Sequence, residues 1–202
     1  MKNLLLLYSA LLIGVCTSVQ AQNLRLGFKT GLSFTSFVGP DAADASSKPG
    51  FQAGLLANLR FNDLLSVQPE VQYSTKGAKI GRGNTISGSQ SLKYLDVPVL
   101  VRANYHQFFA EAGPQLGILL SAAATNDLII PATTANNKSL FNPLDVGYAI
   151  GAGVQAASGP FAGVRYNGGI RNIAKSGTTN NQLPEGRNSA LQFYVGFLFG
   201  GE

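Results

Sequence analysis

Hydrophobic and polar residues alternate with a period of two between residues 51 and 61. Only a β-strand places alternate residues on opposite faces, so this pattern predicts a strand with one apolar face. The apolar positions are Phe51, Ala53, Leu55, Ala57, Leu59 and Phe61. The positions between them are Gln52, Gly54, Leu56, Asn58 and Arg60.

A second strand with the same pattern spans residues 65–74, after the pair Asn62-Asp63. Asn and Asp tolerate the positive φ angles of a tight turn, so the two strands are predicted to form a hairpin. Each strand has about eleven residues, whereas strands of soluble sheets most often have roughly 5–6. A tilted strand needs roughly 9–11 residues to cross a bilayer, which this hairpin satisfies.

The alternation recurs along the chain and predicts eight strands, at residues 24–34, 51–61, 65–74, 91–105, 107–120, 145–157, 161–173 and 189–199. Short connections, near residues 62–63, 104–107 and 158–160, alternate with long ones near 36–49, 79–90, 121–143 and 174–188. Outer-membrane barrels have short periplasmic turns and long external loops. The predicted fold is all-β, an eight-stranded antiparallel transmembrane up-and-down β-barrel with both ends of the barrel chain on the periplasmic side.

The composition favours the membrane over water as the surroundings of the apolar face. The opposite face consists mostly of Gly, Gln, Asn and Ser, and charged residues make up 12% of the chain, about half the ~25% of ordinary soluble domains. In a membrane barrel the apolar face contacts lipid and the polar face lines the lumen. A soluble periplasmic, lipocalin-like binder stays open as an alternative.

Residues 1–21 are predicted to be a secretory signal peptide, followed by one barrel domain over residues 22–202. Lys2 supplies the positive charge, residues 4–15 form the apolar region, and Val19-Gln20-Ala21 fits a cleavage site. The chain's one cysteine, Cys16, lies in this segment, so the mature chain has no disulfide. The bulky Val15 before it argues against lipidation.

Four sequence runs resemble the PorT-type outer-membrane β-barrel domain, often called "porin family", of Bacteroidetes-type bacteria. They are GFQAG at 50–54, LSVQPEVQYSTKGA at 65–78, KYLDVPVL at 93–100 and FFAEAGPQLG at 108–117. A weaker match is GVRYNGG at 163–169. The resemblance implies the fold and an outer-membrane location. Some members of that family belong to secretion or gliding machinery, and the motifs do not select this branch.

By parity, many charged residues are predicted to point into the lumen. An eight-stranded barrel is only wide enough to be filled by side chains, and buried charges need partners. We therefore predict a salt-bridged polar plug, with Glu111 paired to Arg102 or Arg165; a proton or anion path is the alternative. The predicted lumen network comprises Arg25, Lys29, Arg60, Glu70, Asp96, Arg102, Glu111, Arg165 and Arg171. Lys76 points inward by the same parity.

Three prolines, Pro69, Pro98 and Pro114, fall inside predicted strands. Proline removes a ladder donor and is normally found at edges or bulges. A closed barrel has no edge, so we predict bulges at these prolines.

The chemistry-bearing residues give little support to catalysis. The only histidine, His106, is predicted in a periplasmic turn, away from the external boundary where a lipid hydrolase would work. Asp41 and Asp44 are too sparse for a calcium site. Gly147, Gly151 and Gly153 precede no helix, so they are interpreted as packing glycines.

The sequence thus predicts an outer-membrane protein of a Gram-negative bacterium with a structural or surface-binding role through its external loops. No catalytic, cofactor or metal site is predicted. Outer-membrane lipid and other envelope proteins are the expected partners, and a monomer is expected. Nucleic acid is not expected, despite a pI near 9.4, because the bases are dispersed or lumenal. A lipid-modifying barrel enzyme and a component of a secretion machinery are the alternatives.

Overall fold

The structure, a computed structural model, describes residues 24–39, 45–82, 85–126, 133–136, 138–173 and 186–200. The predicted signal peptide, together with Asp41 and Asp44, lies outside the described residues.

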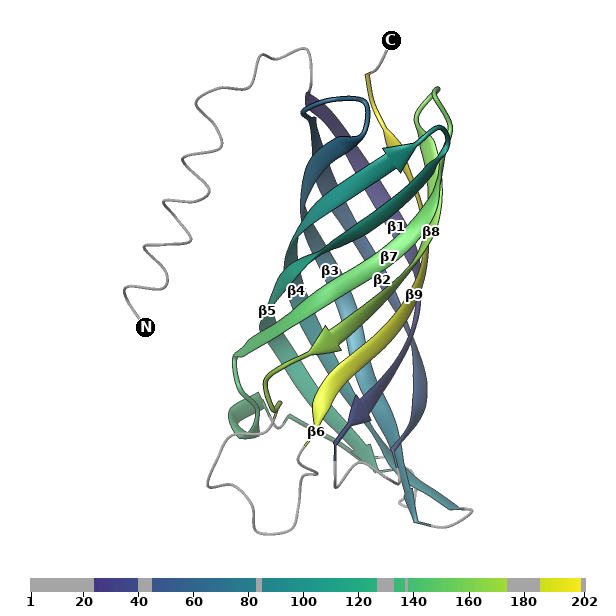
Figure 1. The fold of residues 1–202 in the computed structure, drawn as a ribbon. Coiled ribbons are helices and arrows are strands. Elements are labelled where there is room, and N and C mark those ends of the chain that lie inside the picture. Colours follow the sequence, from purple (N-terminus) through teal and green to yellow (C-terminus); the bar gives the residue numbers. More distant parts are fainter. Residues whose placement is uncertain are drawn as a thin grey trace, which may run out of the picture.

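Eight antiparallel strands close into a barrel (Figure 1), as the sequence predicts. Each strand pairs with the next along the chain except where β7 follows β5, and β1 pairs with β9 to close the wall. The wall strands are β1 (Leu24–Val38), β2 (Ala45–Arg60), β3 (Leu65–Arg82), β4 (Thr85–Tyr105), β5 (Phe108–Asn126), β7 (Leu144–Gln155), β8 (Pro160–Gly169) and β9 (Arg187–Leu198).

The strands at one end of the barrel are longer than predicted. The sequence pattern predicts a loop over residues 79–90, but β3 continues to Arg82 and β4 begins at Thr85. A short strand, β6 (Thr133–Asn136), pairs with the end of β5 inside the predicted loop 121–143, and the 3-10 helix η2 (Lys138–Leu140) follows. Backbone pairing needs no apolar alternation outside a bilayer, so the hydrophobic pattern ends before the strands do.

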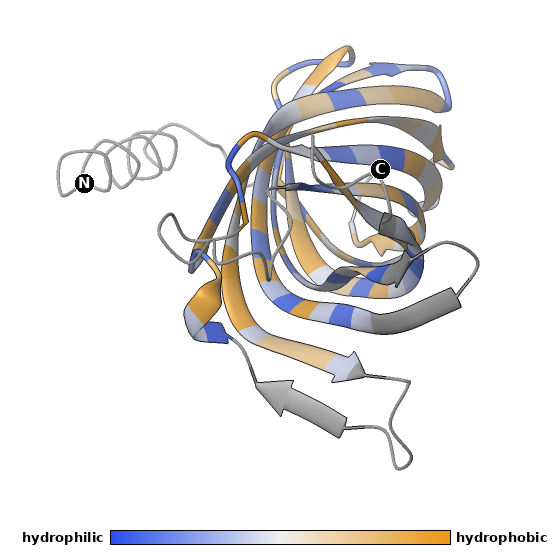
Figure 2. Cartoon of the chain, turned by 90° about the horizontal axis from the view of Figure 1, so that it is seen from below, coloured by the Kyte–Doolittle hydropathy of each residue, from blue (hydrophilic) through white to orange (hydrophobic). Residues whose placement is uncertain are grey.

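The wall has the predicted inside-out pattern. Leu32 and Leu55 point outward and are 64% and 70% exposed, while Gln52 and Asp96 point inward and are fully buried. Hydrophilic and hydrophobic residues alternate along the strands in Figure 2. An apolar exterior around a polar interior suits lipid outside and a filled lumen inside.

Both ends of the wall, the start of β1 and the end of β9, lie at the end of the barrel that has the short turns, at the top of Figure 1. We call this the periplasmic end and the other the external end. Asn62 makes one short turn, its side-chain oxygen accepting hydrogen bonds from the backbone N–H groups of Leu64 (2.9 Å) and Leu65 (2.7 Å). His106 makes another, with a φ of 54°, a left-handed angle that tight hairpin turns require.

The three prolines do not form bulges, which corrects the prediction. Pro69, Pro98 and Pro114 pair in register with Val99, Gln115 and Tyr148 of one neighbouring strand. On the other side the ladder skips two positions and resumes in the same register. A missing N–H removes a hydrogen bond without adding a residue, so the register is kept.

Register shifts occur elsewhere, between Ser47 and Gln52 in β2, between Ile80 and Gly81 in β3, and between Lys93 and Tyr94 in β4. All three lie in the external half of the barrel. Among the described residues, no helix is long and apolar enough to cross a membrane.

Candidate functional site

The lumen is filled by four layers of side chains, and each layer is built by residues from several strands. From the periplasmic end they are an apolar cluster around Arg102, a network of four charges, a cluster of three charges and an external apolar cluster.

Arg102 lies in the periplasmic layer and is fully buried. Its guanidinium stacks on Phe109, 3.6 Å from the ring centroid, and donates to the side-chain oxygens of Gln68 (2.6 Å) and Gln155 (3.0 Å). Stacking on an aromatic face and hydrogen bonds to amide oxygens both suit a guanidinium. The apolar members of this layer are Leu56, Phe109, Phe161, Tyr194 and Leu198.

The four-charge network consists of Lys29, Glu70, Glu111 and Arg165, all of them nearly inaccessible to solvent. Arg165 binds Glu70 through two parallel bonds of 2.8 and 2.9 Å and contacts Glu111 at 2.6 Å. Lys29 lies 2.8 Å from Glu70. Two cations thus balance two carboxylates, and the bidentate bond is the strong arrangement for a guanidinium.

Gly151 explains how Glu111 of β5 reaches Arg165 of β8 across the intervening strand β7. Gly151 pairs with Glu111 on one side and with Arg165 on the other. A Cβ at this position would lie 3.1 Å from Glu111 Oε1 and 2.7 Å from the carbonyl oxygen of Val164. A side chain here would therefore crowd the backbone of β8 and press on the Glu111 carboxylate, in agreement with a packing role for this glycine.

Tyr194 completes the network from β9. Its hydroxyl donates to Glu111 Oε1 at 2.7 Å, and its ring lies under Lys29 Nζ, 4.8 Å from the ring centroid. Side chains from β1, β3, β5, β8 and β9 thus fix one another at this level of the lumen.

The three-charge cluster lies on the external side of this network and consists of Lys76, Asp96 and Asp145. Lys76 Nζ lies 3.0 Å from Asp96 and 3.4 Å from Asp145, and Ser74 donates to Asp96 at 2.5 Å. Gly117 of β5 separates the two carboxylates, since it pairs with Asp96 on β4 and Asp145 on β7. Lys76 thus bridges two carboxylates that lie on either side of β5, at the position where β5 has a glycine.

The external apolar cluster closes the lumen at the far end. Phe141 follows η2 and is 2% exposed. The residues after η2, 141–143, are held in place by two backbone hydrogen bonds. Leu119 N–H donates to the Pro143 carbonyl (2.9 Å), and Asn142 N–H donates to the Ile173 carbonyl (2.8 Å). The cluster comprises Phe37, Ala78, Leu92, Tyr94, Leu119, Ala122, Phe141 and Ile173.

The structure places the predicted lumen residues unevenly. Glu111 pairs with Arg165, one of its two predicted partners, and not with Arg102, although Arg102 lies opposite it in the β4–β5 ladder. Arg60 and Arg171 are exposed, which corrects their assignment to the lumen. Arg60 is the last residue of β2, and Arg171 follows the end of β8. A side chain with inward parity at a strand end lies at the mouth of the barrel and contacts water. Arg25, near the start of β1, is only partly buried and donates to the Leu198 carbonyl at 3.1 Å.

Sequence reasoning did not identify Asp145, Tyr94 or Tyr194 as partners of the charges. Asp145 shares the inward parity of Gly147, and both tyrosines lie on the polar faces of their strands. That parity, combined with the need of Lys76 for a second partner, is the signal that could have identified Asp145.

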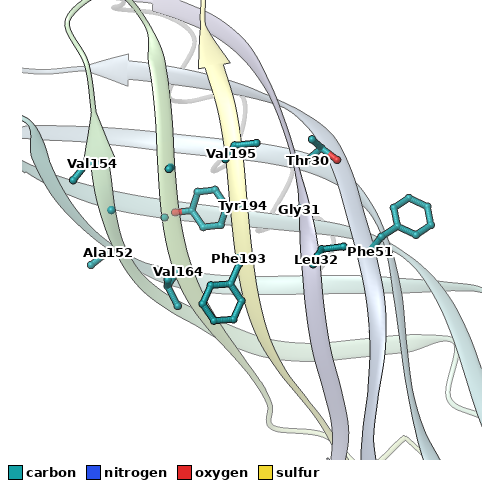
Figure 3. A pocket seen from close by; sticks show the side chains of 13 residues that line it. Thr30, Gly31, Leu32, Phe51, Ala152, Val154, Val164, Phe193, Tyr194 and Val195 are labelled. Atoms are coloured by element: carbon teal, nitrogen blue, oxygen red, sulfur yellow. The ribbon is translucent and has the colours of Figure 1, made fainter.

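A hollow of about 770 Å³ lies on the outer wall, over β1, β2, β7, β8 and β9 (Figure 3). Leu32, Phe51 and Phe193 frame it, and Ala152 and Ala162 form part of its floor. These side chains belong to the apolar exterior, the face that lipid contacts.

His106 is exposed in its turn, with its ring against Tyr105 at 4.5 Å between centroids. Among the described residues, no group of three or more His, Cys, Asp and Glu side chains could hold a metal ion.

Two solved structures are similar to the chain in fold. The first is Neisserial surface protein A (TM-score 0.53, 16% identity, 85% of this chain and 96% of that chain covered). The second is Ail, the attachment invasion locus protein of Yersinia pestis, in complex with the heparin analogue sucrose octasulfate (TM-score 0.50, 13% identity, 88% and 99% covered). No curated protein matches the sequence significantly.

A family model described as "Outer membrane protein beta-barrel domain" matches residues 20–175. Together with the closed eight-stranded wall, its apolar exterior and its polar lumen, this match places the protein in the outer membrane of a Gram-negative bacterium. The chain belongs to the outer membrane protein beta-barrel domain family.

Proposed function

We propose that this barrel is a non-enzymatic, non-conducting protein that binds polyanionic glycans at the cell surface through its external end. The observation that carries the proposal is the filled lumen. Four successive layers of side chains occupy the lumen, so a transported molecule has no evident path through it. The two ends of the barrel are then the surfaces at which the protein can bind a partner.

The described residues offer little for catalysis. Each buried carboxylate, Glu70, Asp96, Glu111 and Asp145, is paired with a cation in the interior of the barrel. An acid–base catalyst must reach its substrate, and His106, which is exposed, lies at the periplasmic end. This arrangement favours a binding role over the lipid-modifying enzyme.

The external end projects beyond a bilayer. β4 has 21 residues, which corresponds to about 70 Å along the strand and about 50 Å along the barrel axis when tilted by ~45°. The apolar band of such barrels is only ~25 Å tall. A polar wall built by β2 to β5 therefore reaches into the space where surface glycans lie.

The described surface of this end carries positive charge. Its acidic residues among those described, Asp96 and Asp145, are buried in the lumen, and the charged residues that reach its surface are all basic. Lys and Arg bind sulfate and phosphate groups, and a surface of one sign attracts a polyanion before contact. The basic residues are Lys48, Lys79, Lys93, Lys138, Arg171 and Arg187.

The similarity to Ail supports the choice of ligand class. That protein has the same architecture and was crystallised with a sulfated heparin analogue. The PorT-type branch is a finer assignment within the family, which we propose on the four sequence runs at 50–54, 65–78, 93–100 and 108–117.

Heparin-affinity chromatography of the detergent-solubilised barrel tests the proposal. We expect retention that falls steeply with salt, as for other multi-charge contacts. Substitution of Lys48, Lys79 and Lys93 by glutamine together should lower the eluting salt concentration, while Arg60→Gln at the periplasmic end should leave it unchanged. An uncharged dextran column is the control for the matrix.

Absence of retention at low salt would contradict the proposal. An unchanged elution of the triple variant, or a loss of retention in Arg60→Gln, would place the binding elsewhere and would equally contradict it.

A further inference from the structure

A small cavity lies in the lumen where the external ends of β7, β8 and β9 meet, and Lys76 and Asp145 of the three-charge cluster form part of its lining. Gly147, Gly168 and Gly169 form part of its wall, and their missing side chains leave the space open. The space for the centre of a water-sized sphere is about 10 Å³, which corresponds to a single small occupant.

Three buried oxygen atoms of the residues that line this cavity have no hydrogen-bond partner among the described residues. They are Asp145 Oδ1, Asn167 Oδ1 and Asn188 Oδ1. The three side chains are 8%, 5% and 5% exposed. A buried polar atom without a partner is costly, so three of them around one cavity indicate a shared ligand.

The hydrogen bonds of the amide groups fix which atoms are left for the ligand. Asn188 Nδ2 donates to Asp145 Oδ2 at 2.8 Å and to the Tyr94 hydroxyl at 3.4 Å. Asn167 Nδ2 donates to Gln115 Oε1. Both amide nitrogens thus donate hydrogen bonds to neighbouring side chains, whereas the two amide oxygens have no donor among the described residues. The ligand of these three oxygens must therefore be a cation or a hydrogen-bond donor.

The formal charge of the adjoining cluster distinguishes these two. Lys76 contributes +1 and Asp96 and Asp145 contribute −1 each, which leaves −1 for the cluster. A buried net charge is unfavourable, and one monovalent cation would neutralise it. A divalent ion would leave an excess of +1, next to Lys76.

We propose that Asp145, Asn167 and Asn188 bind a monovalent alkali cation, such as Na⁺, at the external end of the lumen. One carboxylate oxygen and two amide oxygens form a hard-oxygen ligand set, which suits alkali and alkaline-earth cations and not softer metals. The cation joins β7, β8 and β9, the three shortest strands of the wall, where β8 ends and β7 and β9 begin.

Urea unfolding of the detergent-solubilised barrel tests this site. A ligand that binds only the folded state raises its stability with the logarithm of the ligand concentration. We expect a higher unfolding midpoint in NaCl than in choline chloride of equal ionic strength, with a difference that grows as the salt concentration rises. Asn167→Ala should abolish the difference between the two salts.

Asn58→Ala is the matched control, because Asn58 is an equally buried amide at the periplasmic end, bonded to Ser66 and Gln68. It should lower the midpoint in both salts and keep the difference between them. Anomalous diffraction from crystals of the unmodified barrel grown with Tl⁺ should show a peak among the three oxygens.

Equal midpoints of the unmodified barrel in the two salts, together with no anomalous peak, would mean that a water molecule occupies the cavity and would overturn the proposal. Persistence of the sodium effect in Asn167→Ala would overturn the assignment to these residues.

Discussion

Replacement of Arg165 by methionine should lower the free energy of unfolding by about 3–5 kcal/mol, the range for removing one partner of a buried ion pair. Arg165 binds both carboxylates of the four-charge network. Without it Glu70 keeps Lys29 and Glu111 keeps only the Tyr194 hydroxyl. Urea titration of the refolded barrel in detergent, followed by the heat-dependent shift on a gel, measures the loss.

Arg187→Met is the matched control, since Arg187 is exposed at the start of β9. Surface substitutions of this kind change stability by about 0.5 kcal/mol or less. Equal midpoints for Arg165→Met and the unmodified barrel would contradict the structural role given to the network.

The second large effect is expected on the outer face. Leu55 projects outward from the middle of the bilayer-spanning part of β2 and is 70% exposed. An arginine on the lipid face of a barrel costs about 2–4 kcal/mol at the midplane and about 0–1 kcal/mol near the interfaces. Leu55→Arg should therefore lower the stability in lipid vesicles by the larger amount.

Phe61→Arg tests the dependence on depth. Phe61 also points outward, but it lies at the periplasmic turn after β2. The smaller loss is expected for it. Equal losses for the two variants, or no loss for Leu55→Arg, would mean that this face does not contact hydrocarbon.

The period of two, together with the alternating loop lengths and the composition of the polar face, predicts the barrel. Once the alternation identifies a strand, the low proportion of Lys and Glu on the polar face indicates which face is inside. This parity correctly placed Lys29, Glu70 and Asp96 in the lumen, because residues in the middle of a strand have no other environment available. It also limited the partners of Glu111 to Arg102 and Arg165, of which Arg165 is the one found.

Parity could not give the depth of a side chain along the barrel. Arg60 and Arg171 have inward parity, but they lie at or beyond strand ends, so they reach solvent. Nor could it show that ion pairs form across an intervening glycine, as Glu111 and Arg165 do over Gly151. That choice depends on the register of three strands at once.

The external half was the least predictable part. Strand pairing there is not accompanied by an apolar face, so the pattern of β3 and β4 resembles that of a polar loop. The bulges at Ser47–Gln52, Ile80–Gly81 and Lys93–Tyr94 belong to this half. Pro49 lies within the first of them, and neither of the other two contains a proline.

Single-channel recording in a planar lipid bilayer tests the central claim, a lumen sealed by its own side chains, most directly. The layers around Arg102, Arg165, Lys76 and Phe141 fill a barrel of this strand number. The purified protein should insert and give no steady conductance above the baseline of the membrane. Stable, step-like openings in the unmodified protein would contradict a sealed lumen and would assign the barrel a role in transport.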